Sequence, residues 1–302
     1  MALRVGNGSP TATYDQLLQA AARARLPYDK DVWLNLAFFL GYQYVEWAAD
    51  ATTIREIPRK AGFENTPRPV ANKIMHFVMQ EHSMALKSKP TVDVLPATDD
   101  PVDASDSAVS LAYCNWLALP QVCDFDGVLS EASMWALIKE GFVKWTFDAS
   151  ENRGDICSVS PLDLYIDPYC KSFRHARWAI HTQFMDPEQV YDVYNKEVKP
   201  ATQSRTDPLK TALLREMGQS PVLNGVQVNE LWMRPNRRYP KGRFCVWAGN
   251  EFLIEPTDFP YEHGRLPFTQ LGSVPIPGAP HFNSAVSFLR APQMELNKYH
   301  AQ

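Results

Sequence analysis

Residues 141–159 read GFVKWTFDASENRGDICSV, and this stretch decides the fold class of the chain. Val143, Trp145 and Phe147 alternate with polar residues, which is the two-residue period of a β-strand. The turn-rich residues 150–154 follow, and apolar residues then return. The stretch therefore predicts a β-hairpin.

Upstream of the hairpin the apolar residues recur at the helical period of about 3.6. We expect a short helix over residues 11–25 that Pro27 ends. A longer helix should start at Asp29 or Asp31, whose side chains can cap it. A third helical pattern covers residues 70–87, with apolar residues on two faces.

Residues 91–95 resemble a strand, and two further helices follow them. One should start at Ser105 or the next residue and stop at Pro120. The other should start at Asp124 and end with Gly141 as its C-terminal cap. The short connection predicts an antiparallel helical pair.

Downstream of the hairpin, residues 177–184 alternate as a strand. Asp186-Pro187 and Asp207-Pro208 each place a cap before a proline, which opens a short helix, and Gly218 closes the second one. A meander of three strands is expected at Val226–Met233, Phe244–Trp247 and Phe252–Glu255. The sequence thus predicts an α+β fold, in which N-terminal helices and a helical pair pack with antiparallel hairpins.

The last helical pattern begins at Ser284 and continues to the end of the sequence. Pro292 is expected to begin a second helical piece.

The chain has 302 residues, 45% of them hydrophobic and 21% charged, so it can bury a core. Its net charge of −4 argues against a broad basic face that grips nucleic acid. Five irregularly spaced cysteines exclude a disulfide scaffold and favour free thiols. With no secretory signal and no apolar run of about 20 residues, we expect no membrane partner.

The sequence contains neither a glycine-rich phosphate loop nor a Gly-x-Ser-x-Gly elbow. The best candidate cluster for a metal-dependent nuclease contains two aspartates and one of two histidines, namely Asp163, Asp167, and His175 or His181. Prolines near both aspartates favour the capping of turns instead. We therefore expect no catalytic residues, no cofactor and no metal, and the nuclease is the alternative hypothesis.

The strongest positive patch is residues 234–243, with Arg237, Arg238 and Lys241. It falls at a predicted hairpin tip. A solvated turn is the simpler interpretation, and contact with DNA phosphates or an acidic partner is the other.

Five segments spread over almost the whole chain occur together in one order. They are Trp33-x5-Phe39-x-Gly41-x-Gln43-Tyr44, Asn72-Lys73-Ile74, Gly154-Asp155-Ile156 through Pro161-Leu162-Asp163-Leu164-Tyr165-Ile166-Asp167-Pro168, Asp186-Pro187-Glu188-Gln189-Val190, and Leu289-Arg290-Ala291-Pro292-Gln293-Met294-Glu295-Leu296-Asn297-Lys298. Each segment is weakly specific, and the ordered set is the specific feature. In this order the chain resembles the portal proteins of tailed bacteriophages.

The resemblance implies a structural subunit of a ring, usually of twelve copies, at one vertex of the capsid. The ring is assembled in the host cytoplasm and becomes part of the virion. Double-stranded DNA would pass through it during packaging and ejection. Its partners would be the terminase large subunit, the head–tail adaptor, the capsid and scaffolding proteins, and other copies of the chain.

Portal chains are divided into wing, stem, clip and crown. Residues 1–282 resemble the wing and residues 283–302 the start of the first stem helix, while the second stem helix, clip and crown have no counterpart. Gln293, Asn297 and Gln302 would then be candidates for contacts between subunits, with a solvated helix face as the alternative.

A third hypothesis is a peripheral scaffold that binds another protein through the proline-rich residues 256–280. It differs from the portal hypothesis only in the symmetry of assembly.

Overall fold

The chain folds as an α+β protein in this computed structural model, which describes residues 10–49, 53–59, 61–62, 65, 67–87, 91–148, 152–199, 201–204, 213 and 222–301. The helices are α1 (Ala12–Phe39), α2 (Lys73–Lys87), α3 (Pro101–Leu117), α4 (Phe125–Ile138), the 3₁₀ turn η1 (Phe173–His175), α5 (Pro187–Tyr194) and α7 (Ala285–His300). The strands are β1 (Val45–Trp47), β2 (Ile54–Glu56), β3 (Glu140–Asp148), β4 (Arg153–Val159), β5 (Leu164–Ile166), β6 (Trp178–Met185), β7 (Ala201–Ser204), β8 (Val222–Met233), β9 (Arg243–Ala248), β10 (Glu251–Thr257), β11 (Phe268–Gly272), β12 (Val274–Pro275) and β13 (Phe282–Asn283).

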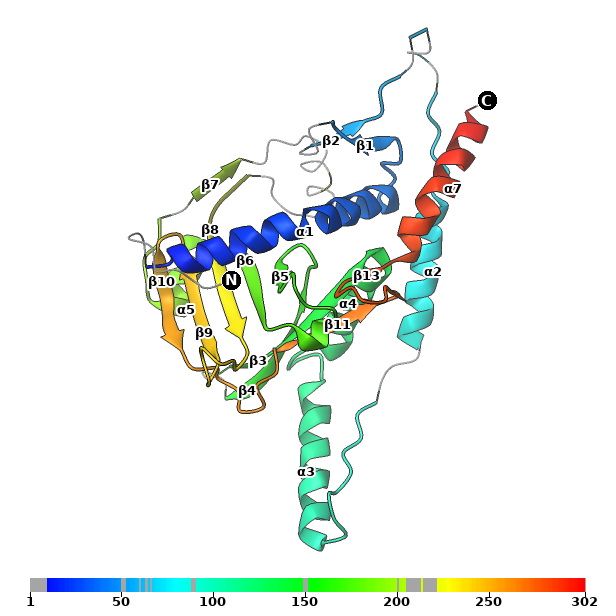
Figure 1. Ribbon diagram of the computed structural model, residues 1–302. Helices are drawn as coiled ribbons and strands as arrows, with labels where there is room; N and C mark the ends of the chain where they lie inside the picture. Colours follow the sequence, from blue (N-terminus) through cyan, green and yellow to red (C-terminus); the bar gives the residue numbers. More distant parts are fainter. Residues whose placement is uncertain are drawn as a thin grey trace.

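Two antiparallel sheets form the centre of the molecule (Figure 1). The larger has the order β10-β9-β8-β6-β5, with β7 paired to β8, and the smaller has the order β11-β3-β4. Phe142 of the smaller sheet and Trp232 of the larger belong to one core between them. Helix α1 covers the outer face of the larger sheet through Tyr14 and Ala21, and α4 covers the smaller sheet through Ala132. The core is therefore layered as helix, sheet, sheet and helix.

The strands of the predicted hairpin and meander form where the sequence patterns place them. Strands β3 and β4 form the predicted hairpin, and β8, β9 and β10 form the predicted meander. Helix α5 opens with the predicted Asp186-Pro187 pair, and Gln189 completes a capping box there. The helix predicted from Asp207-Pro208 to Gly218 falls almost entirely outside the described residues.

Helix α1 is a correction to the sequence prediction, because it runs through Pro27 without a break. Proline removes one backbone hydrogen bond, but most helix stability in a folded protein comes from packing. Here Ala21 is buried against the sheet and Phe38 against the other helices, so both halves are held. Pro27 itself is exposed, which leaves its ring out of the core.

The end of α4 is a second correction. Asp124 caps its start as predicted, but Gly141 is not the C-terminal cap, since β3 already begins at Glu140. A Cβ atom at Gly141 would lie 2.0 Å from the backbone oxygen of Ala132. The glycine is needed because the strand passes directly against the helix.

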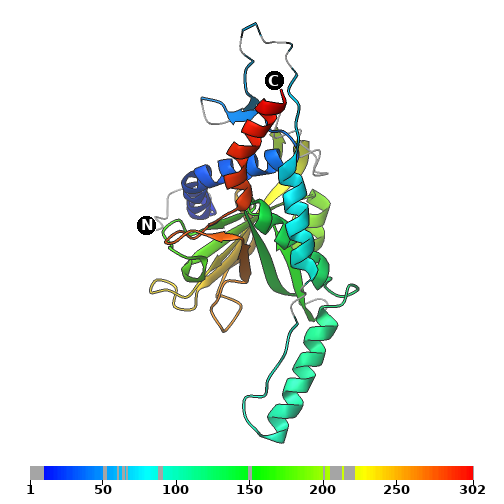
Figure 2. The same ribbon diagram turned by 90° about the vertical axis from the view of Figure 1, so that its right-hand side faces the viewer.

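The predicted helical pair is also wrong. Helix α3 begins at Pro101, capped by Asp100, and projects away from the body in both views, while α4 packs against β3 and α2 (Figures 1 and 2). Of its residues only Leu117 is buried. Residues 91–95 form no strand and run beside this helix as an extended segment.

Helix α7 packs against α1, α2 and α4. It is continuous through Pro292, which corrects the expected break, and Pro292 is exposed as Pro27 is. The five cysteines are unpaired, as expected. No helix within the described ranges is both long and apolar enough to cross a membrane.

Candidate functional site

A groove of about 660 Å³ lies between the first half of α1 and the loop that joins β8 to β9. Leu17 and Ala20 of α1 and Trp178 of β6 give it an apolar floor. Arg237 and Arg238 of the loop, both exposed, give it a positive rim. The predicted basic hairpin tip is thus confirmed in position, and it forms one wall of a concave site.

Hydrogen bonds within the loop and a glycine turn fix its shape. The side-chain oxygen of Asn236 accepts from the backbone N–H groups of Arg238 and Tyr239, both at 3.0 Å. Gly242 has φ +74°, and a Cβ atom there would lie 2.7 Å from the carbonyl oxygen of Met233. Only glycine fits that turn, so the positions of the two arginines are set by the fold.

Lys241 does not line the groove. Its ammonium lies 3.1 Å from a carboxylate oxygen of Asp258, and both side chains are largely exposed. The structure therefore separates Lys241 from the other two predicted contact residues.

Asp167, a candidate nuclease residue, lies at the edge of the same groove, but its carboxylate is already paired within the chain. Its two oxygens accept from the Arg177 guanidinium at 2.5 and 3.0 Å, and the N–H of Tyr169 donates to one of them at 3.1 Å. Burial alone would raise the pKa of Asp167, but these hydrogen bonds outweigh burial and lower the pKa below its usual value. The carboxylate therefore stays charged. The pair fixes Arg177, whose side chain is 60% exposed, on the groove wall.

The other nuclease candidates do not gather around Asp167. The side chain of His181 is buried between the sheets, His175 lies in η1, and Asp163 lies in the turn before β5, where its carbonyl oxygen accepts from the N–H of Thr182. Within the described ranges, no three His, Cys, Asp or Glu side chains are arranged to hold a metal ion. The arrangement does not supply the ligand set that the nuclease hypothesis requires.

His181 belongs instead to a buried charged group between the two sheets. Lys144 of β3 donates to Glu230 of β8 at 2.6 Å, and His181 Nδ1 lies 3.6 Å from the same oxygen. Burial acts to raise the pKa of Glu230, but the charge and the hydrogen bond of Lys144, together with the nearby His181 imidazole, lower it to about 2. Burial lowers the pKa of His181. The group links the sheets by an ion pair.

Gln293 and Asn297 of α7 face the interior of their own chain, contrary to the expectation that they contact another subunit. Asn297 Nδ2 donates to Gln43 Oε1 at 2.6 Å, and its oxygen accepts from Gln293 at 3.0 Å. Gln43 in turn donates to Asn72 Oδ1 at 2.9 Å. We call these four side chains the amide cluster. Gln302, the third predicted amide, lies outside the described residues.

The amide cluster also holds the backbone around it. Gln293 accepts from the N–H of Lys73 at 3.1 Å and donates to the carbonyl of Ala71 at 2.8 Å. Asn72 accepts from the N–H of Met75, which caps α2, and donates to the carbonyl of Phe39 at the end of α1. The cluster thus fastens α7 to the junction of α1 and α2.

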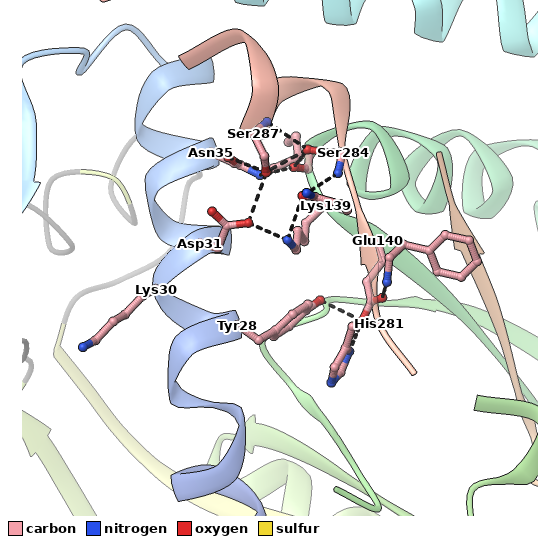
Figure 3. A network of polar contacts seen from close by, with 12 residues as sticks. Tyr28, Lys30, Asp31, Asn35, Lys139, Glu140, His281, Ser284 and Ser287 are labelled. Atoms are coloured by element: carbon pink, nitrogen blue, oxygen red, sulfur yellow. Dashed lines mark hydrogen bonds and ion pairs between the residues drawn. The ribbon is translucent and has the colours of Figure 1, made fainter. Parts of the chain in front are cut away.

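A second polar network joins the N-terminal part of α7 to α1 and the start of β3 (Figure 3). Asp31 of α1 accepts from Lys139 and Arg290, both at 2.5 Å, and from the Ser287 hydroxyl at 3.1 Å. Burial acts to raise the pKa of Asp31, but the Lys139 hydrogen bond and the Arg290 charge lower it. Asn35 donates to the hydroxyl of Ser287 and to backbone at the end of α4.

Glu140 is the fully buried carboxylate of this network (Figure 3). It accepts from the Tyr28 hydroxyl at 2.8 Å and from the N–H of Phe282 at 2.9 Å, and His281 Nδ1 lies 2.8 Å away. A hydrogen bond from Gln270 completes its set. Burial, followed by the charge of Glu140, raises the pKa of Tyr28 well above its usual range. These contacts join α1, β3, β11 and β13.

Sequence reasoning missed Arg177, Lys144, Glu230 and Glu140. Their partners come from other strands and helices, and no local pattern reveals such pairs. Lys144 stands at a polar position of the alternating pattern, and yet it is buried while its neighbour Trp145 is 43% exposed.

No protein-family model matches the chain, and a search of curated proteins found no match either.

Proposed function

We propose that this chain is a subunit of a tailed-bacteriophage portal, the structural ring at the capsid vertex that serves as the channel for double-stranded DNA. The observation that carries the proposal is the amide cluster. Its members come from three of the segments on which the resemblance rests, and those segments lie up to about 250 residues apart.

Gln43 comes from the first segment, Asn72 from the second, and Gln293 and Asn297 from the last. Each of these amides is bonded to at least one other member of the cluster. Buried amides need their partners, because an unsatisfied polar group costs about 1–3 kcal/mol. The network brings together residues from three of the segments on which the resemblance rests, and this convergence supports the proposal.

The central segment, residues 161–168, supports the proposal in the same way. Arg25 of α1 donates to the carbonyl oxygens of Leu162 at 2.6 Å and Leu164 at 2.5 Å. Its guanidinium also lies 4.0 Å from the ring centre of Tyr165. This family-like segment thus fastens the first half of α1 to the sheet, as the amide cluster fastens the second half to α7.

The direction of α7 agrees with a helix that leads out of a wing domain toward a stem. Its first half is embedded, with Val286 fully buried, whereas Tyr299 in its last turn is 75% exposed. In both views its end projects from the body on the side opposite to α3 (Figures 1 and 2).

The proposed partners are those of a portal ring: further copies of the chain, usually twelve in total, the terminase large subunit, the head–tail adaptor, and the capsid and scaffolding proteins. The ring would be assembled in the host cytoplasm and retained in the virion. In this role the chain works as a structural and translocation component.

Native mass spectrometry of the purified chain tests the proposal. A closed ring predicts one dominant assembly with a fixed number of copies of the 34.2 kDa chain. A continuous ladder of chain lengths, or a stable dimer with nothing larger, would contradict it.

A further inference from the structure

The arm, which we define as residues 91–118, projects from the body with an unusual surface (Figures 1 and 2). Val102 and Val109 of α3 are 63% and 66% exposed, and Tyr113 and Trp116 are also exposed. Their spacings of seven, four and three residues place all four on one helical face. A contiguous apolar face of this kind marks an interaction surface.

The arm is also strongly acidic. It contains Asp93, Asp99, Asp100, Asp103 and Asp106 and no Lys, Arg or His, although the whole chain has a net charge of only −4. Any surface that accepts the arm should therefore combine an apolar floor with positive charge.

The groove between α1 and the β8–β9 loop has both properties. Its floor is apolar, and Arg237 and Arg238 rise on one side. Arg177, held by Asp167, stands on another wall. Arginine is well suited to such a rim because its planar guanidinium binds carboxylates with two hydrogen bonds.

We infer that the arm of one copy docks into the groove of a second copy, with arm carboxylates on the groove arginines and Val102 over the apolar floor. The inference rests on the proposed function, since it supplies a contact between neighbouring subunits. The arm points away from α1, which lines the groove, so the complementary surface is met on another copy (Figure 1).

The arm and the groove are different surfaces, so the contact is heterologous, or head to tail. Such contacts build rings when the rotation between neighbours closes, and open filaments when it does not. Each copy offers one arm and one groove. A copy with a defective groove can still bind a neighbour through its arm, and a copy with a defective arm can still bind a neighbour through its groove.

This asymmetry gives a sharp test with two variants of the full chain. The groove variant is Arg237→Glu with Arg238→Glu, and the arm variant is Asp99→Lys with Asp106→Lys. These residues are exposed and leave the Asp100 cap and the Asp103–Thr98 hydrogen bond in place. The control, Glu188→Lys with Asp192→Lys, reverses two exposed charges on α5.

Sedimentation velocity at low salt should show the unaltered chain and the control self-associating, with weaker association as salt is added. Each variant alone should associate at least about tenfold more weakly. An equal mixture of the two variants should recover association, because the unaltered arm meets the unaltered groove at one junction and the reversed charges of arm and groove attract each other at the other.

The inference is overturned if the unaltered chain stays monomeric at every concentration, which would leave the groove to another occupant. It is also overturned if either variant associates as the control does, or if the mixture stays monomeric. If both variants still form rings, the arm contact is wrong and the portal proposal is retained. If the chain forms only open filaments that depend on the arm, the arm contact is retained and the portal proposal is wrong.

Discussion

At the scale of single residues, Lys144 and Glu230 form an ion pair in the core between the two sheets. Both side chains are largely buried between the sheets. Glu230→Gln would leave the Lys144 charge without a counter-charge and should lower the free energy of unfolding by about 3–5 kcal/mol. Urea denaturation measures this, with the exposed Glu251→Gln as the matched control. Equal stability of the two variants would show that the pair is solvated.

The same group makes stability depend on pH. The folded pKa of Glu230 is about 2, below its ordinary value of 4.5, so the stability it contributes is complete above pH 4.5 and is lost as pH falls toward 2. The pKa of His181 is also lowered, from 6.5, so protonation of His181 opposes folding as pH falls below that value.

The unfolding free energy, measured from pH 7 downward, should therefore fall in two stages. In Glu230→Gln the stage below pH 4.5 should become shallower. An unchanged acid slope in that variant would contradict the assignment.

The site residues were predictable only where their role is local. The basic loop was visible because it lies between two strand patterns, and the capping role of Asp124 was visible because it directly precedes a helical pattern. Asp167 and His181 were mistaken for possible metal ligands because their partners, Arg177 and Glu230, reach them across the sheet. Such pairs depend on strand register, which a single sequence does not display.

At the scale of elements, the two prolines inside helices give a test of what stabilises α1 and α7. Each is exposed and interrupts the backbone hydrogen bonding without ending the helix. Pro27→Ala and Pro292→Ala should each raise the free energy of unfolding by roughly 1–3 kcal/mol. Pro67→Ala, in an exposed segment outside any helix, is the control and should have no such effect. A loss of stability in the helical variants would mean that the proline rings make contacts the helices need.

The amide cluster should govern the local stability of α7. Hydrogen exchange should show protection through Asn297 and rapid exchange at residues 299–301, where the helix is exposed. Asn297→Ala removes the partners of Gln43 and of the Ala71 N–H, and should accelerate exchange along the helix. Glu295→Ala, on the exposed face, should change little. Equal exchange in both variants would show that apolar packing alone holds α7.

The helices, the β3–β4 hairpin, β6 and the β8–β10 meander followed from periodicity, whereas the short strands β1, β2, β5, β7, β11, β12 and β13 were not predicted. The breaks at Pro27 and Pro292, and the cap at Gly141, were inferred from local preference, which tertiary packing overrode. The helical pair was inferred from a short connection, but α3 has few buried residues and does not fold back. The apolar residues of α3 recur as those of a core helix do, so the sequence did not reveal that this face is exposed.

At the scale of the whole molecule, the layered core explains how one chain can present two different surfaces. The sheets and α1 fix the groove on one face, while the arm leaves the body from the connection before α4. The groove is built on this layered core and the arm is anchored to it through Leu117, so each copy offers both surfaces of a head-to-tail contact.

Electron microscopy of the negatively stained, purified chain tests the portal proposal most directly. The account predicts class averages of a closed, rotationally symmetric ring with a central opening. Particles that are uniformly monomeric, or assemblies without rotational symmetry and without a central opening, would contradict it.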